Sequence, residues 1–154
     1  MRSLLSGVAV VVGVALSGMA AAHEYKEGTV KIEHPHAAPT LPGAKTGAVY
    51  MEIVNNGKEP LEIKSLSTPV ADSVEVHTMA VTGGIMRMRP VALPIAIAAG
   101  ESLKLVKDRH IMLIGLKKPL AEEEMVPFKI EFANGKTMEI DLYVEGAAEN
   151  HDNH

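Results

Sequence analysis

Cysteine and tryptophan are both absent from this chain of 154 residues. Without cysteine the chain has no disulfide, no blue-copper thiolate, no cysteine-based zinc site, no thiol redox pair and no cysteine for lipoprotein attachment. Only three tyrosines and two phenylalanines are present, so aromatic platforms for stacking bases or sugars are scarce. The stability of the folded protein must therefore come from a hydrophobic core.

Clusters of basic residues are lacking as well. The formal net charge is −4, and no run of lysine and arginine forms a footprint for phosphates. Nucleic acid is therefore not an expected partner. Neither a Ser/His/Asp set nor a pair of carboxylates occurs in a recognisable catalytic context. These absences argue against the common hydrolytic enzymes.

The first 22 residues have the layout of a secretory signal peptide. Arg2 precedes an apolar run that ends in small residues, and Ala20 and Ala22 satisfy the A-x-A preference for cleavage. Cleavage after Ala22 would leave His23 as the N-terminus and a periplasmic protein with no membrane insertion. An uncleaved anchor is the alternative, because the run is near the shortest length that spans a bilayer.

The remaining chain alternates short apolar strands with turn signals, which predicts an all-β domain over residues 23–144. About eight or nine strands at this spacing indicate an antiparallel Greek-key β-sandwich or barrel. Residues 145–154 are polar and predicted to form a flexible tail. Single strands are expected at residues 29–34, 48–55, 61–68, 73–79 and 109–116, with hairpins at 81–88 and 126–144.

Methionine and histidine are paired at a spacing that has geometric meaning. In a strand, residues i and i+2 point to the same face. A hairpin at Gly83-Gly84 would bring two such pairs close together, and a Greek-key connection could bring a third from a later strand. The pairs are His77 with Met79, Met86 with Met88, and His110 with Met112.

A set of imidazoles and thioethers indicates copper. Soft thioether ligands favour Cu(I), whereas Ca²⁺ and Mg²⁺ require oxygen donors. A thioether also needs no deprotonation before it binds. A site of two histidines and two methionines would therefore suit a carrier of Cu(I) outside the cytoplasm. Packing is the competing interpretation, because Met79, Met86 and Met112, each taken alone, would be ordinary core residues. The spacing by itself leaves both interpretations open.

The chain also resembles the periplasmic copper chaperones called PCu(A)C. Their pattern is a histidine, ten residues, a methionine, twenty-one residues and His-x-Met, which His77, Met88 and His110-Ile-Met112 reproduce. Residues 34–55 and 111–132 are similar to that family too, and the resemblance covers about residues 29–144. One departure is His36, where the family usually has tryptophan.

The resemblance implies a cupredoxin-like β-sandwich that holds Cu(I) near one exposed end. It implies His77, Met88, His110 and Met112 as ligands, with Met79 and Met86 as neighbours or alternate ligands during transfer. It also implies delivery of copper to the CuA subunit of cytochrome c oxidase, alongside a Sco-type thiol protein. Copper storage or tolerance in the periplasm is the alternative.

The other histidines are weaker candidates. His23 could chelate Cu(II) if it is the free N-terminus, and His151 and His154 could form a secondary Cu(II) site in the tail. His34 and His36 flank a proline and are expected at the surface or the edge of the core rather than as ligands.

Two further classes of function remain. A copper oxidase would need a second histidine placed against His23, and for a polysaccharide substrate an aromatic platform, which the low aromatic content disfavours. A structural β-sandwich without metal would make the methionine pairs part of the core.

Overall fold

The computed structural model describes residues 24–146, and every regular element among them is a β-strand. The predicted all-β fold is confirmed. The predicted signal segment, His23, His151 and His154 lie outside the described residues. The strands are β1 (Glu24–Glu27), β2 (Val30–Ala37), β3 (Thr46–Asn55), β4 (Leu61–Ser67), β5 (Ala71–Thr82), β6 (Ile85–Val91), β7 (Ile95–Ile97), β8 (Ser102–Leu105), β9 (Arg109–Leu116), β10 (Met125–Phe132) and β11 (Thr137–Val144).

Local turn chemistry explains both predicted hairpins. Gly83 and Gly84 have φ values of 61° and 78° and connect β5 to β6, and Gly135 has a φ of 85° in the turn between β10 and β11. Residues other than glycine rarely adopt this left-handed backbone conformation, so the glycines allow the chain to turn at these positions. The sequence prediction missed the short strands β1, β7 and β8, because three or four residues carry too little periodicity to be recognised.

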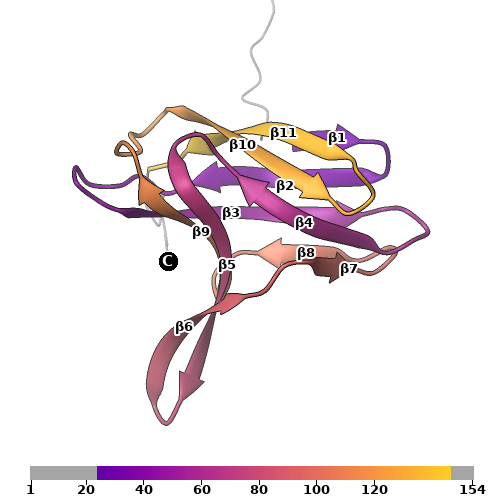
Figure 1. Ribbon diagram of the computed structural model, residues 1–154, viewed down its shortest axis with the longest axis horizontal. Coiled ribbons are helices and arrows are strands. Elements are labelled where there is room, and N and C mark those ends of the chain that lie inside the picture. Colours follow the sequence, from indigo (N-terminus) through magenta and orange to yellow (C-terminus); the bar gives the residue numbers. More distant parts are fainter. Residues whose placement is uncertain (1–23, 147–154) are drawn as a thin grey trace, which may run out of the picture.

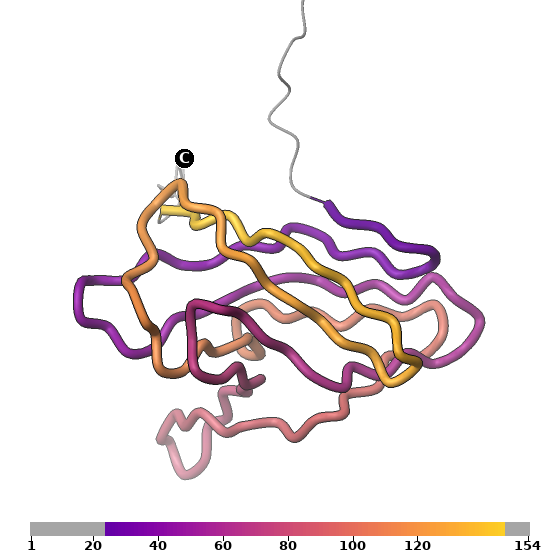
Figure 2. The backbone as a smooth tube through the Cα atoms, turned by 45° about the horizontal axis from the view of Figure 1, so that its top comes forward, coloured from indigo at the N-terminus to yellow at the C-terminus, as the bar shows by residue number. Residues whose placement is uncertain are grey.

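The strands form one sheet in the order β6-β5-β9-β3-β2-β11-β10-β4-β7, with β1 added to β2 and β8 added to β3. Figure 1 shows β1, β2, β10 and β11 on one side of the molecule and β7 and β8 on the other. The backbone trace in Figure 2 also shows that the sheet folds over, so that its strands form two layers. Among the described strands, β2 and β11 are parallel neighbours, which the antiparallel prediction did not include.

Aliphatic side chains from alternating positions fill the interior. In β3, for example, Val49, Met51 and Ile53 are buried, whereas the residues between them are partly exposed. β9 contributes Ile111 and Leu113 to the same core. The opposite face of these central strands is therefore available for other functions.

The hairpin of β5 and β6 projects away from the rest of the domain (Figure 1). Every residue from 80 to 90 is exposed. Its apolar side chains are not core residues, because Val81 is 68% exposed and Ile85 is 55% exposed.

The chain just after β11 is hydrogen-bonded to β2. The backbone N–H of Glu145 donates to the carbonyl of Ala37 at 3.0 Å. Residues 147–154, the rest of the predicted tail, lie outside the described residues. Within residues 24–146 there is no helix long and apolar enough to cross a membrane.

Candidate metal centre

The predicted ligand pairs meet on the outer face of three neighbouring strands. β5 lies between β9 and β6 in the sheet. His77 of β5 is directly opposite His110 of β9, and Met79 of β5 is opposite Met88 of β6. Residues opposite each other in a ladder share a face, and so do residues two apart in one strand. The register therefore places His77, Met79, Met88, His110 and Met112 on one face.

The two histidines form the middle of this cluster. Their ring centroids are 6.5 Å apart. His110 is 6% exposed, and the side chain of His77 is 16% exposed. The Nδ1 atoms of both rings are buried, and neither has a hydrogen-bond partner among the described residues. A buried polar atom without a partner costs about 1–3 kcal/mol, and a metal ion bound at Nδ1 would remove that cost.

A carboxylate orients one of these rings. Nε2 of His77 lies 2.8 Å from Oε2 of Glu75. A carboxylate accepts hydrogen bonds, so Nε2 carries a proton and donates it, and in the neutral ring the lone pair is then on Nδ1. Metal-binding histidines commonly have this arrangement, with the second ring nitrogen held by a carboxylate. Glu75 was not among the predicted site residues, although its position two residues before His77 on the same face was a usable signal.

The methionines separate into core residues and surface residues. Met51 and Met138 are 1% and 5% exposed and belong to the core. By contrast, Met88 is 51% exposed and Met86 is 63% exposed, and both lie on β6. Met79 and Met112 are half-buried and also lie outside the core cluster. Packing therefore explains Met51 and Met138 and does not explain the methionines near the histidines.

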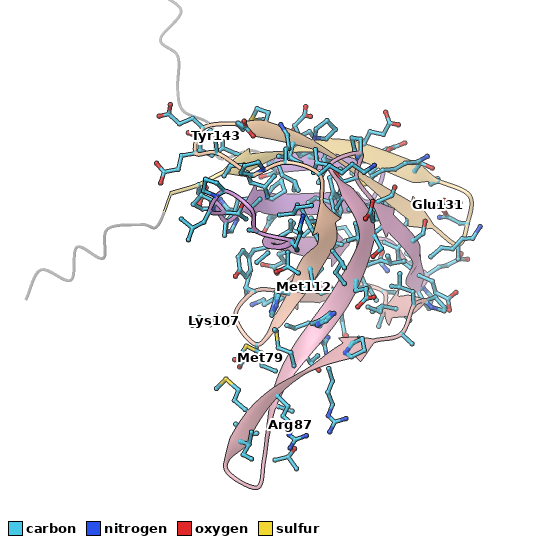
Figure 3. The ribbon with its side chains drawn as sticks, turned by 60° about the vertical axis from the view of Figure 1, so that its left-hand side comes forward. Met79, Arg87, Lys107, Met112, Glu131 and Tyr143 are labelled. Carbon is cyan, nitrogen blue, oxygen red and sulfur yellow. The ribbon has the colours of Figure 1, made fainter. Side chains whose placement is uncertain are left out.

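The register also ranks the methionines by their distance from the histidine pair. Met112 is opposite Glu75, on one side of that pair, and the Met79–Met88 pair is on the other. Met86 is opposite Val81, two residues farther toward the tip of the hairpin. Figure 3 shows Met112 nearer the body of the domain and Met79 at the base of the hairpin. Met79 is at least as near to His77 as Met88 is, so the backbone does not choose between these two thioethers.

An aromatic side chain continues the face beyond the histidines. The ring of Tyr50 in β3 lies 6.1 Å from that of His110 and 5.3 Å from that of His36. His110 thus lies between Tyr50 of β3 on one side and His77 of β5 on the other. No signal in the sequence marked Tyr50, because its neighbours belong to other strands.

The all-β fold matches the cupredoxin-like structures of PCuAC domains. The apo PCuAC domain of PmoF1 is 22% identical to the chain, with a TM-score of 0.67, and the match covers 80% of this chain and 99% of that domain. The copper-bound PCuAC domain of PmoF2 gives the same identity and TM-score over 80% and 98%. At this identity these matches show the fold.

Two solution structures of DR1885 from Deinococcus radiodurans are also similar. The apo form is 25% identical with a TM-score of 0.57, over 97% of this chain and 96% of that one. The Cu(I) form is 28% identical with a TM-score of 0.56, over 72% and 74%. The matches to PCuAC domains and to DR1885 together confirm the resemblance to PCu(A)C proteins that the sequence indicated.

The family itself follows from a match over residues 30–144 to the family described as "Putative lipoprotein LpqE-like". The chain belongs to this LpqE-like family. A protein of Leifsonia xyli subsp. xyli (strain CTCB07), also named "Putative lipoprotein", is 27% identical over 113 residues, which are 71% of this chain and 68% of that protein. The present 154 residues contain no cysteine that could carry a lipid.

Proposed function

We propose that this protein is a periplasmic copper chaperone that binds Cu(I) through His77, Met88, His110 and Met112. The observation that carries the proposal is the pair of buried, unpartnered Nδ1 atoms on facing histidines with methionines on both sides. Two imidazoles and two thioethers form a soft ligand set that suits Cu(I). Cu(I) is then the cargo of the protein, and the protein has no enzymatic activity.

Relatives support copper as the metal. DR1885 has been obtained with Cu(I), and the PCuAC domain of PmoF2 has been obtained with copper. The family description and the name of the Leifsonia relative both indicate a lipoprotein, which agrees with an exported protein of the cell envelope. A cysteine-free thioether site also suits an oxidising compartment, because methionine forms no disulfides.

The exposure of the methionines favours transfer over storage. Met88 and Met86 lie on the projecting hairpin, where a recipient can approach them directly. Spare thioethers at Met79 and Met86 would let each incoming ligand displace one outgoing ligand. The expected recipient is the CuA subunit of cytochrome c oxidase, together with a Sco-type thiol protein, as in the family that the chain resembles.

The hairpin has a second face that would suit an acidic recipient. Arg87 and Arg89 alternate with the methionines of β6 and therefore point to the opposite face. Thr78 of β5 is paired with Arg89 of β6 on one side and with Arg109 of β9 on the other. Three exposed guanidinium groups thus lie behind the thioethers of a chain that is acidic as a whole. Complementary charge of this kind accelerates the encounter of two proteins.

X-ray absorption on the Cu(I)-loaded protein tests the ligand set. We expect two sulfur and two nitrogen neighbours around each copper ion. A shell of nitrogen and oxygen alone would contradict the proposal, because it would place copper away from the methionines.

Replacing Glu75 with glutamine should lower the affinity for Cu(I) by about 10-fold, within the range usual for residues that orient a ligand. An amide presents an NH₂ group as well as an oxygen, so it holds the His77 ring and its proton less firmly. The affinity is measured by competition with a colorimetric Cu(I) chelator. Glu139→Gln is the matched control, because Glu139 is an exposed residue of β11 outside the cluster. An equal loss of affinity in both variants would mean that Glu75 has no specific role.

A further inference from the structure

A second group of metal-ligand side chains lies on the domain, apart from the methionines. His34 and His36 of β2 and Glu145 after β11 each offer one ligand atom, and these atoms all lie within 4.8 Å of one another. Nε2 of His34 is 3.3 Å from Oε1 of Glu145. We propose that His34, His36 and Glu145 form a second metal site that is selective for Cu(II).

The backbone holds the three side chains in place. The pairing of β2 with β3 shifts register between Glu33 and His36, which marks a β-bulge, and His34 within it has a φ of 49°. A positive φ is uncommon for a residue other than glycine and clusters at functional positions. Pro35 is buried and anchors the bulge between the two histidines.

Glu145 reaches the same place through the parallel pairing of β11 with β2. Tyr143 is opposite His36 and Val144 is opposite Ala37, so Glu145 follows directly. Its N–H group donates to the carbonyl of Ala37 at 3.0 Å. The carboxylate therefore belongs to the folded domain, although the sequence had assigned it to the tail.

The tautomer of His36 is already suited to a metal. Nδ1 of His36 lies 2.8 Å from the carbonyl oxygen of His34. A carbonyl only accepts, so Nδ1 carries the proton and Nε2 presents its lone pair. Metal-binding histidines typically donate their other N–H to a backbone carbonyl in this way. The ring is also fixed by stacking on Tyr50, with centroids 5.3 Å apart and planes 29° apart.

The ligand chemistry selects the oxidation state and the metal. Two imidazoles and a carboxylate, with no thioether, favour a divalent transition metal over Cu(I). Among these metals, Cu(II) binds nitrogen and oxygen ligands more tightly than Zn(II) does. His34 and Glu145 have side chains that are 58% and 38% exposed, so the ion would enter from solvent. The site is independent of the Cu(I) proposal, because it shares none of its ligands.

Electron paramagnetic resonance on the full chain tests this site. His23, His151 and His154 are first replaced by alanine, which removes the other candidate Cu(II) ligands. Titration should then give one Cu(II) ion per chain with hyperfine coupling to two nitrogens. His36→Phe keeps an aromatic ring on Tyr50 and removes the ligand, so it should weaken Cu(II) binding by at least about 10-fold. Glu145→Gln should alter the spectrum.

Two comparisons make the result decisive. His110→Phe should leave the Cu(II) signal intact, and the His36→Phe protein should keep its affinity for Cu(I), which also shows that it is folded. The proposal is overturned if His36→Phe retains the Cu(II) signal or if His110→Phe abolishes it. Displacement of Cu(II) by an equimolar amount of Zn(II) would overturn the choice of metal.

Discussion

A protein with His110 replaced by phenylalanine should bind Cu(I) at least about 100-fold more weakly, which corresponds to about 2.7 kcal/mol. The same variant should unfold, without metal, at an unchanged or higher temperature. His110 is 6% exposed, and its buried Nδ1 has no partner among the described residues. Phenylalanine removes this uncompensated nitrogen, whose cost is about 1–3 kcal/mol, and keeps a ring beside Tyr50.

These two measurements separate a ligand from a structural residue. A residue that serves only packing or hydrogen bonding would lose stability when replaced and would leave the copper affinity unchanged. Chelator competition gives the affinity, and thermal unfolding of the apo protein gives the stability, where each kcal/mol shifts the midpoint by roughly 3–6 °C. A large drop in the midpoint with unchanged affinity would exclude His110 as a ligand.

Replacing Met88 and Met112 together with leucine should also reduce Cu(I) affinity by at least about 100-fold. Leucine has a similar volume and no sulfur, so the change removes two soft ligands with little effect on packing. Met88 is 51% exposed and Met112 is half-buried, and neither belongs to the core. The stability of the apo protein should therefore change by less than about 1.5 kcal/mol.

Met125→Leu is the matched control for this experiment. Met125 is 43% exposed on β10, on a strand that does not pair with β5, β6 or β9. It should leave the affinity unchanged. If the double variant keeps the affinity of the original protein, the carrier proposal fails. If the double variant loses only part of its affinity and the addition of Met79→Leu removes the rest, then Met79 takes the place of Met88 as the ligand, which the register of β5 and β6 permits.

The alternation of the strands could be read directly from local sequence. β9 was predicted at its observed bounds, and the glycine turns after Thr82 and Asn134 define hairpins through their own backbone requirements. The shared face of His77 with Met79, and of His110 with Met112, follows from the same period of two. These features depend on residues that are close together in the chain, so they can be inferred from short stretches of sequence.

The position of β9 beside β5 needed the tertiary structure. More than thirty residues separate His77 from His110 in the chain. No local sequence pattern indicates that their strands, β5 and β9, are neighbours in the sheet. The pairing of these two strands aligns the two imidazoles and places Met112 opposite Glu75. The position of Tyr50 beside His110 follows from a further long-range pairing, that of β3 with β9, so it could not be inferred before the fold was known.

The chain therefore determined by itself its all-β character, its two hairpins and the residues that are proposed to bind copper. Only the folded structure decided which histidine ring nitrogens are buried without a partner among the described residues, and which histidines lie in the cluster of His34, His36 and Glu145. The physical reason is that alternation and turn preferences are local, whereas a metal site is made by side chains that separate strands bring to one face. His36 illustrates this difference, because its ring is oriented by a bulge and by Tyr50, which lies on another strand.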